Sequence, residues 1–588
     1  MVTSRRGMRW FAAAGALALL AGLGGCATIT AIGTTGTGPA HERVVASAPV
    51  GRSAAGNYLA AEHAGTARDN AAAADYFERA LRADPTSSAI LEHAFLLDVA
   101  EGDIAHAATL AQRIVALDPS SRMARLILSL DDLKAGRYAQ AGTEIDAASG
   151  QDTSDVIWVT IRAWIYAGSG DSDKAIALLT SQQARTSLGA FALYHEALVL
   201  DYAGRVAEAD RAYATAIIAA EGHSMRLLEA YGGFLIRNGR AGDALKLYRA
   251  YNAKMPGNPV VEGLLADALA GRTAKQALIA TPAEGAAESL YGIAAVLAGQ
   301  RSAELPLVYV QLALYLRPGL DIGLALRGEL FEAEENWSGA AKSFSAVSPH
   351  SPLAAFAAVS RARDLARLER FDEATALMRV SVKTDPNDVD ALVALGDLYR
   401  AQEKWRDAAA TYGRALNVTG ADQQWQILYA RGVALERSGD WPQAEALLQK
   451  ALVLQPDQPQ ILNYLGYSWI DRGEHLTQAL ELIGKAVAAK PDDGYIVDSL
   501  GWAYFRLGDY ANATRFLERA VELKPDDPTI NDHLGDAYWR VGRRLEARFQ
   551  WNHALAFKPA DEDAKKIAKK LADGLDDPPV SSGPGSRS

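Results

Sequence analysis

The sequence has little of what metal, redox and nucleic acid sites require. Cys26 is the only cysteine in 588 residues, so neither an intramolecular disulfide nor a cysteine zinc site can form. The ten histidines include no HExxH pair. Acidic residues outnumber basic ones by 71 to 60, which gives a formal net charge of -11 and no overall positive field for phosphates. We therefore expect no metal, no cofactor and no nucleic acid partner.

Motifs of catalytic acyl and phosphate chemistry are also missing. The chain contains no GxSxG nucleophile elbow, no GxxxxGK phosphate loop and no GxGxxG sequence after a strand pattern. Asp498 and Asp532 are separated by one length of the repeat described below, so they indicate structure or recognition and not a hydrolytic acid pair. These observations predict a protein without enzymatic activity.

Residues 1–25 have the pattern of an export signal. "MVTSRRGMRW" carries three arginines and no acid, and residues 10–25 form an uncharged, mostly apolar run. A transmembrane helix needs about 20 apolar residues, so a cleaved signal fits this shorter run better than a permanent span. The sequence "LGGC" at residues 23–26 then resembles the lipobox of bacterial lipoproteins.

This resemblance implies a lipoprotein signal peptide over residues 1–25 and acyl chains, palmitate among them, on Cys26. Several acyl chains give a stable anchor at about 0.8 kcal/mol per buried CH₂. Ala27, where an aspartate would favour the inner membrane, implies an outer-membrane lipoprotein that faces the periplasm. The alternative is an ordinary signal peptide with a chance cysteine. Residues 26–56 are rich in Thr, Gly, Ala and Ser and predict a flexible tether on the order of 30 Å long.

Prolines and glycines recur with a regular period in the C-terminal half. The prolines are Pro456, Pro491, Pro525 and Pro559, which are almost evenly spaced. The glycines keep a similar spacing, at Gly396, Gly432, Gly466, Gly501 and Gly535. A period of about 34 residues indicates stacked helical hairpins.

The repeat at residues 494–527 shows why these positions recur. Gly501 on a first helix and Ala520 on a second must be small, because the two helices cross there. Gly508 marks the turn between the helices, and Pro525 ends the second helix. This spacing of small, aromatic and proline residues resembles the tetratricopeptide repeat (TPR) family.

The TPR resemblance implies an all-α fold, a superhelical solenoid of about fourteen helical hairpins with a capping C-terminal helix. After the signal peptide and tether, we predict an N-terminal array at residues 57–258 and an irregular or partial repeat at 259–285. We predict a C-terminal array at 286–561, the capping helix at 562–575 and a disordered tail at 576–588.

Function in such a fold resides on the surface, where first helices line a concave groove. Helical spacing from the glycines points twelve side chains inward as candidate partner-binding residues: Tyr429, Arg437, Asn463, Tyr467, Asp471, Asp498, Trp502, Arg506, Asp532, Asp536, Trp539 and Arg540. Aromatic residues and arginine are frequent anchors of protein interfaces. The alternative is that they are solvated groove residues or inter-repeat packing. His475, in the one-residue insertion of "DRGEHL", is interpreted as a solvated loop residue.

The lipobox, the long array and the sequences "GYSWIDRGEHLTQALELIGKAV", "DSLGWAYFRLGDY" and "HLGDAYWRVGRRLEARFQW" together resemble proteobacterial outer-membrane TPR lipoproteins. This resemblance implies an adaptor that recruits and activates a periplasmic carboxyl-terminal processing protease in cell-wall remodelling. The alternative is a TPR scaffold for exopolysaccharide secretion, envelope assembly or peptidoglycan synthase activation.

Overall fold

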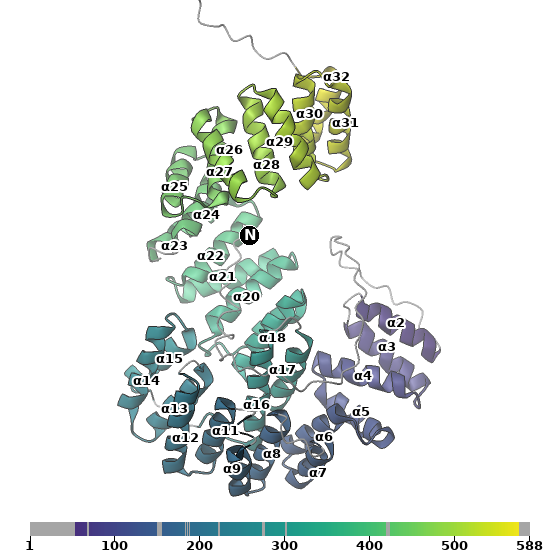
Figure 1. Cartoon of the computed structure of the whole chain (residues 1–588), viewed down its shortest axis with the longest axis vertical. Coiled ribbons are helices and arrows are strands. Elements are labelled where there is room, and N and C mark those ends of the chain that lie inside the picture. Colours follow the sequence, from purple (N-terminus) through teal and green to yellow (C-terminus); the bar gives the residue numbers. More distant parts are fainter. Residues whose placement is uncertain are drawn as a thin grey trace, which may run out of the picture. The chain divides into compact units, whose positions relative to one another are not determined.

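The computed structural model describes residues 53–575, except 67–69, 150–155, 183, 185, 187–188, 222–223, 273–276, 300–302 and 419–423. Cys26, the signal peptide, most of the predicted tether and the tail at 576–588 lie outside the described residues. The regular structure of the described part is entirely helical (Figure 1). The all-α prediction is therefore confirmed.

The described helices form fourteen consecutive pairs joined by short turns, with α15 and α32 outside the pairs. The pairs before α15 are α2 (Ala54–Thr66) and α3 (Asn70–Ala83), α4 (Ser88–Glu101) and α5 (Ile104–Leu117), α6 (Arg122–Lys134) and α7 (Tyr138–Ser149), α8 (Val156–Gly168) and α9 (Ser172–Thr180), α11 (Ala190–Tyr202) and α12 (Val206–Ala219), and α13 (Met225–Arg237) and α14 (Ala241–Lys254). The helix α15 (Pro259–Leu269) follows them.

The pairs after α15 are α16 (Pro282–Leu297) and α17 (Glu304–Leu316), α18 (Asp321–Ala333) and α19 (Trp337–Ser345), α20 (Ala354–Arg367) and α21 (Phe371–Thr384), α22 (Val389–Ala401) and α23 (Trp405–Val418), α24 (Gln424–Arg437) and α25 (Trp441–Leu454), α26 (Pro459–Arg472) and α27 (Leu476–Ala489), α28 (Gly494–Arg506) and α29 (Tyr510–Leu523), and α30 (Pro528–Arg540) and α31 (Arg544–Ala556). The final helix is α32 (Asp561–Asp573).

The pair α28–α29 shows how sequence sets the local structure. Asp493 caps α28 by accepting a hydrogen bond from the backbone N–H of Tyr495, and Asp509 caps α29 in the same way. Gly508 has a φ of 83°, which a residue with a side chain rarely adopts. A Cβ on Gly501 would lie 2.6 Å from Cγ of Leu517, so the two helices could not approach this closely with any other residue there.

The chain divides into two compact units, unit 1 at residues 1–374 and unit 2 at residues 375–588. The predicted boundaries at 258 and 285 both fall within unit 1. The helix α2 begins at Ala54, ahead of the predicted end of the tether at residue 56. Among the described residues, no helix is both long enough and apolar enough to cross a membrane.

The pair α16–α17 has an unusual position in unit 1. It lies against α4, α6, α8 and α11, the first helices of four preceding pairs (Figure 1). Gly285 lies so close to the Trp164 ring that any side chain in its place would overlap the ring. Farther along, Nε2 of Gln311 donates to the carbonyl of Ala100 over 3.1 Å. The hairpin α16–α17 therefore packs on the first helices of these four pairs.

A buried ion pair fixes α16 to α13. Glu288 is 2% exposed and pairs with Arg226, which also contacts Glu229. The hydroxyl of Tyr194 donates to Oε1 of Glu288 over 3.0 Å. Burial alone would raise the pKa of Glu288, but the Arg226 charge and its hydrogen bonds outweigh burial and lower that pKa. The carboxylate is therefore charged and fully partnered inside the unit.

Helices α18 and α20 bring two acids together away from solvent. Asp364 is 1% exposed, and the charge of Glu332 acts on it. Burial, together with the charge of Glu332, raises the pKa of Asp364 to about 9. The buried pair of acids therefore favours a protonated carboxyl on Asp364 as the pH falls.

Asp364→Asn is expected to stabilise unit 1 at pH 8. An Asp pKa near 9 in the fold, against about 4 in the unfolded chain, means that stability is full below pH 4 and falls as the pH rises towards 9. Asparagine cannot ionise, so we expect a gain in stability at pH 8 and none at pH 4. Hydrogen exchange of α20 at both pH values measures the gain. Asp372→Asn, an exposed acid, is the control, and an equal gain there would contradict the prediction.

Candidate partner-binding surfaces

The twelve predicted residues lie on the first helices α24, α26, α28 and α30 of unit 2, in register with the repeat glycines. Three residues before each glycine stand Tyr429, Asn463, Asp498 and Asp532. One residue after three of the glycines stand Tyr467, Trp502 and Asp536. All of these repeat glycines are followed, four or five residues later, by Arg437, Asp471, Arg506, Trp539 and Arg540. Because these offsets differ by about one helical turn, the rows share one face of each helix, here called the first-helix face.

The C-terminal edge of this face is charged and exposed. The guanidinium of Arg437 lies 5.2 Å from the Trp405 ring centroid. Nη1 of Arg506 lies 3.5 Å from Oδ1 of Asp471, and its Nη2 donates to the Asp471 carbonyl over 3.2 Å. Exposed ion pairs of this kind contribute little to folding, so these groups are available for a partner.

The middle of the face is aromatic and half-buried. The Trp502 ring stacks on His533 at 4.1 Å and on Phe505 at 4.8 Å between centroids. Within the described part of the chain, Nε1 of Trp502 and Oδ1 of Asn463 have no hydrogen-bond partner. Both atoms are buried, so the half-buried Trp502 ring, and not its N–H, is what this part of the face presents to a partner.

Two tyrosines and an arginine complete the half-buried part. Tyr429 packs edge-on against Tyr464 at 5.7 Å between ring centroids. Burial raises the pKa of Tyr467 to about 12, so its hydroxyl is neutral and can donate. The Arg540 guanidinium lies 6.0 Å from the Tyr510 ring centroid, and among described residues its Nε has no partner.

The C-terminal end of the first-helix face is different, because the chain itself covers it. Lys570 of α32 donates to Asp532 and Asp536 over 2.8 Å each. Gly574, just after α32, lies so close to the Trp539 ring that a side chain in its place would overlap the ring. Asp532, Asp536 and Trp539 were predicted to bind a partner, but the structure places them beneath the capping helix.

Asp498 also has an internal partner. It is 7% exposed and accepts a hydrogen bond from Nδ1 of His533 over 3.0 Å. Burial alone would lower the pKa of His533, but the charge of Asp498 outweighs it and raises that pKa. The sequence analysis overlooked His533. Its position, about one repeat after Asp498 on the same face, could have revealed the pair.

The side chain of His475 is exposed, whereas those of Asp498 and His533 are buried. Its side chain is 52% exposed, as expected for a loop residue at the one-residue insertion. Its ring lies 5.0 Å from that of Trp469, and its φ of 46° falls in the left-handed region.

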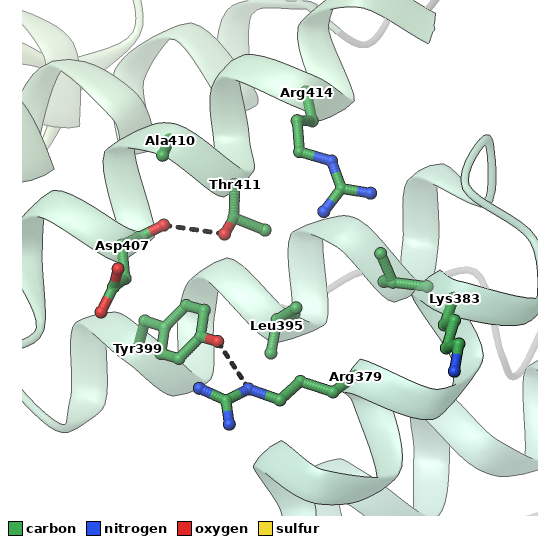
Figure 2. Close-up of a pocket in the computed structure, with 9 residues that line it drawn as sticks. Arg379, Lys383, Leu395, Tyr399, Asp407, Ala410, Thr411 and Arg414 are labelled. Atoms are coloured by element: carbon green, nitrogen blue, oxygen red, sulfur yellow. Dashed lines mark hydrogen bonds between the residues drawn. The ribbon is translucent and has the colours of Figure 1, made fainter.

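A second candidate surface lies between α21 and α23, the second helices of successive pairs. A pocket of about 350 Å³ there is lined by Arg379, Val382, Lys383, Leu395, Tyr399, Asp407, Ala410, Thr411 and Arg414 (Figure 2). We call it the basic pocket. The sequence analysis overlooked it, although Arg379 and Arg414 are about one repeat apart and Lys383 follows Arg379 by one helical turn.

The pocket has charged walls and an apolar base. Nε of Arg379 donates to the hydroxyl of Tyr399 over 2.9 Å, and this contact raises the pKa of Arg379. Val382 and Leu395 are 5% and 4% exposed. Figure 2 shows Arg379 and Arg414 on opposite sides of Leu395. In the described ranges, no three His, Cys, Asp or Glu side chains lie close enough together to hold a metal ion.

Comparison with known families identifies the repeats. The family model "Tetratricopeptide repeat" matches residues 194–259, 393–459 and 429–494, and the model "TPR repeat" matches residues 501–542. The predicted repeat type is therefore confirmed over these residues, which lie in both units. No curated protein is similar enough to the chain to count as a relative.

Several solved structures are similar in fold. A tetratricopeptide repeat protein from Parabacteroides merdae aligns at 16% identity and a TM-score of 0.37, over 43% of this chain and 98% of its own. Cut9–Hcn1 of the APC/C aligns at 16% identity and a TM-score of 0.37, over 88% of this chain and 96% of that one. PilF of Pseudomonas aeruginosa aligns at 17% identity and a TM-score of 0.28, over 31% and 82%. Scores this low do not indicate what this chain binds.

Proposed function

Because this chain is built of tetratricopeptide repeats, we propose that it is a non-enzymatic scaffold that holds a protein partner on the first-helix face of unit 2. The observation that carries the proposal is the row of exposed charged side chains on this face, Arg437, Asp471 and Arg506, next to the half-buried aromatic rings of Tyr467 and Trp502. Aromatic rings give contact area at low entropic cost, and arginine adds planar hydrogen bonding. Unit 1 has less open first-helix surface for a partner, since α16–α17 already covers α4, α6, α8 and α11.

We further propose where the scaffold works and what it holds. The "LGGC" sequence favours a lipid anchor on Cys26 and a position at the outer membrane, facing the periplasm. The resemblance to TPR lipoproteins favours a carboxyl-terminal processing protease as partner, with its substrates, in cell-wall remodelling. An anchored scaffold raises the effective concentration of such partners near the membrane.

Affinity capture from solubilised envelopes tests the proposed partner and its surface. The wild-type chain is expected to recover a periplasmic protease, and the double variant Arg437→Glu, Arg506→Glu to recover about tenfold less, because both arginines are exposed on the proposed interface. Lys485→Glu, an exposed cation on the second helix α27, is the matched control. Equal capture by the double variant would contradict the proposed surface. Recovery of an outer-membrane pore or a peptidoglycan synthase in place of a protease would favour the alternative scaffold role.

Metabolic labelling with palmitate tests the anchor. We expect label in the wild-type chain, and none in Cys26→Ser, because a hydroxyl at that position does not form the thioether. The Cys26→Ser protein should also move from the membrane fraction to the soluble fraction. Equal labelling of the two chains would rule out acylation at Cys26.

A further inference from the structure

We propose that the basic pocket is a second docking site, which takes an acidic, partly aliphatic segment of a protein partner. The pocket is lined by residues of α21, α22 and α23, whereas the predicted residues of the first-helix face lie on α24, α26, α28 and α30. The two sites therefore do not share lining residues, and the pocket's occupant is independent of the proposed function above.

The charges of the pocket are unbalanced. Three cations line it, Arg379, Lys383 and Arg414, against one carboxylate, that of Asp407. Within the described part of the chain, none of the three cations has a carboxylate at ion-pair distance, although acids outnumber bases in the whole sequence. Three like charges around one hollow repel each other, so an entering anion relieves this repulsion.

The geometry suits a carboxylate. The hydrogen bond to Tyr399 holds the Arg379 side chain at the pocket wall, and Nε is the atom it uses, so the terminal nitrogens stay available. A guanidinium presents its N–H groups as a planar fork that matches the two oxygens of a carboxylate. Arg414 lies on the other side of Leu395, so cations border the pocket on two sides (Figure 2).

The apolar base favours a peptide over a small inorganic anion. Val382 and Leu395 contribute the apolar groups of the lining, and the Tyr399 ring lies under the Arg379 guanidinium, 5.5 Å from it. Phosphate has nothing to place against such groups, whereas a leucine or valine next to an Asp or Glu does. The volume of about 350 Å³ is within the range of small ligand pockets and exceeds what one carboxylate needs.

Fluorescence anisotropy of the full chain in detergent, with a labelled peptide GLEDLEG, tests the site. We expect saturable binding that weakens by about tenfold when salt rises from roughly 0.05 to 0.5 M, because the contacts are partly exposed. The neutral peptide GLQNLQG should bind at least about tenfold less tightly, since it lacks the charge. Competition with inorganic phosphate and with vesicles of anionic phospholipid separates a peptide site from a general anion site.

Two double variants assign the binding to the pocket. Arg379→Glu with Arg414→Glu should reduce affinity by about tenfold or more, and Lys383→Glu with Arg414→Glu should also reduce it while leaving the Arg379–Tyr399 hydrogen bond in place. Circular dichroism checks that both fold. Arg437→Glu with Arg506→Glu, on the first-helix face, should bind the peptide as the wild type does.

Each of these binding measurements has a result that would overturn the proposal. No measurable binding of GLEDLEG, equal binding of the neutral peptide, or unchanged affinity in both pocket variants overturns the proposal. Displacement of the peptide by phosphate or by vesicles at equal concentration overturns it too, because the apolar base would then contribute nothing. Loss of binding only in the Arg437 and Arg506 variant would place the peptide on the first-helix face instead.

Discussion

Glu288→Ala is expected to destabilise unit 1 by about 3 kcal/mol, because it leaves the buried cation of Arg226 without its best partner. Arg226 is 13% exposed and Glu288 is 2% exposed, so water cannot replace the lost contact. The hydroxyl of Tyr194 also loses its acceptor. Glu229 stays near Arg226 and keeps the cost at the lower end of the range for broken buried pairs.

Hydrogen exchange of the full chain under rising urea measures this effect, since a chain of two units does not unfold in one step. Amides of α8 and α16 should lose protection at lower urea in the variant. The first control is Asp243→Ala, which removes an exposed partner of Arg240 and should leave the protection of these amides unchanged.

The second control removes both charges of the buried pair. Arg226→Met with Glu288→Leu leaves no unpaired ion, so it should recover most of the lost stability. If the double variant were as unstable as Glu288→Ala alone, the effect would come from packing and the electrostatic explanation would be wrong.

Lys570→Ala is expected to release α32 and to destabilise the end of unit 2 by about 2 to 3 kcal/mol, because Asp532 and Asp536 lose their shared cation. Burial alone would lower the pKa of Lys570, but the two acids outweigh burial and raise it, so the charged amine belongs to the fold. Burial also raises the pKa of Asp536. Without the lysine charge, the end of unit 2 should therefore lose stability as the pH rises and the buried Asp536 ionises.

Limited proteolysis and hydrogen exchange of residues 561–573 follow the release of the helix. Lys565→Ala is the matched control, since Lys565 lies on the same helix, is 72% exposed and pairs only with its neighbour Glu562 in the described structure. Lys570→Met keeps the methylene packing and removes the charge. A stable Lys570→Met protein would show that the stem, and not the ion pair, holds α32 in place.

The points where the two helices of a pair cross could be predicted from the sequence, because each crossing depends on contacts within one repeat. Gly501 meets Leu517 on the next helix of its own pair, where a Cβ would lie 2.6 Å from the leucine Cγ, so the periodic glycines reveal the crossing points. The same period placed the twelve first-helix residues in three rows on one face. The pattern could not show that Asp532, Asp536 and Trp539 are covered, since a lysine at 570 is unremarkable in a charged terminal helix.

Long-range contacts were beyond the sequence pattern. Gly285 and Trp164 are several repeats apart, and neither breaks the helical period, so nothing in the sequence indicated that α16 lies on α8. The pair of Glu288 and Arg226 has the same character, because these two residues are 62 positions apart in the sequence. The basic pocket needed two second helices side by side before its cations could be recognised as one group.

The sequence by itself determined the helical hairpins, their number and the spacing of their small residues, because neighbouring repeats pack through local contacts that recur once per repeat. Only the tertiary structure decided which first-helix faces remain open. Whether a face stays open depends on which other helices pack on it, and these are α16–α17 in unit 1 and α32 in unit 2. Their positions follow from side-chain fit and buried charge pairing between residues far apart in the chain, which no periodic pattern encodes.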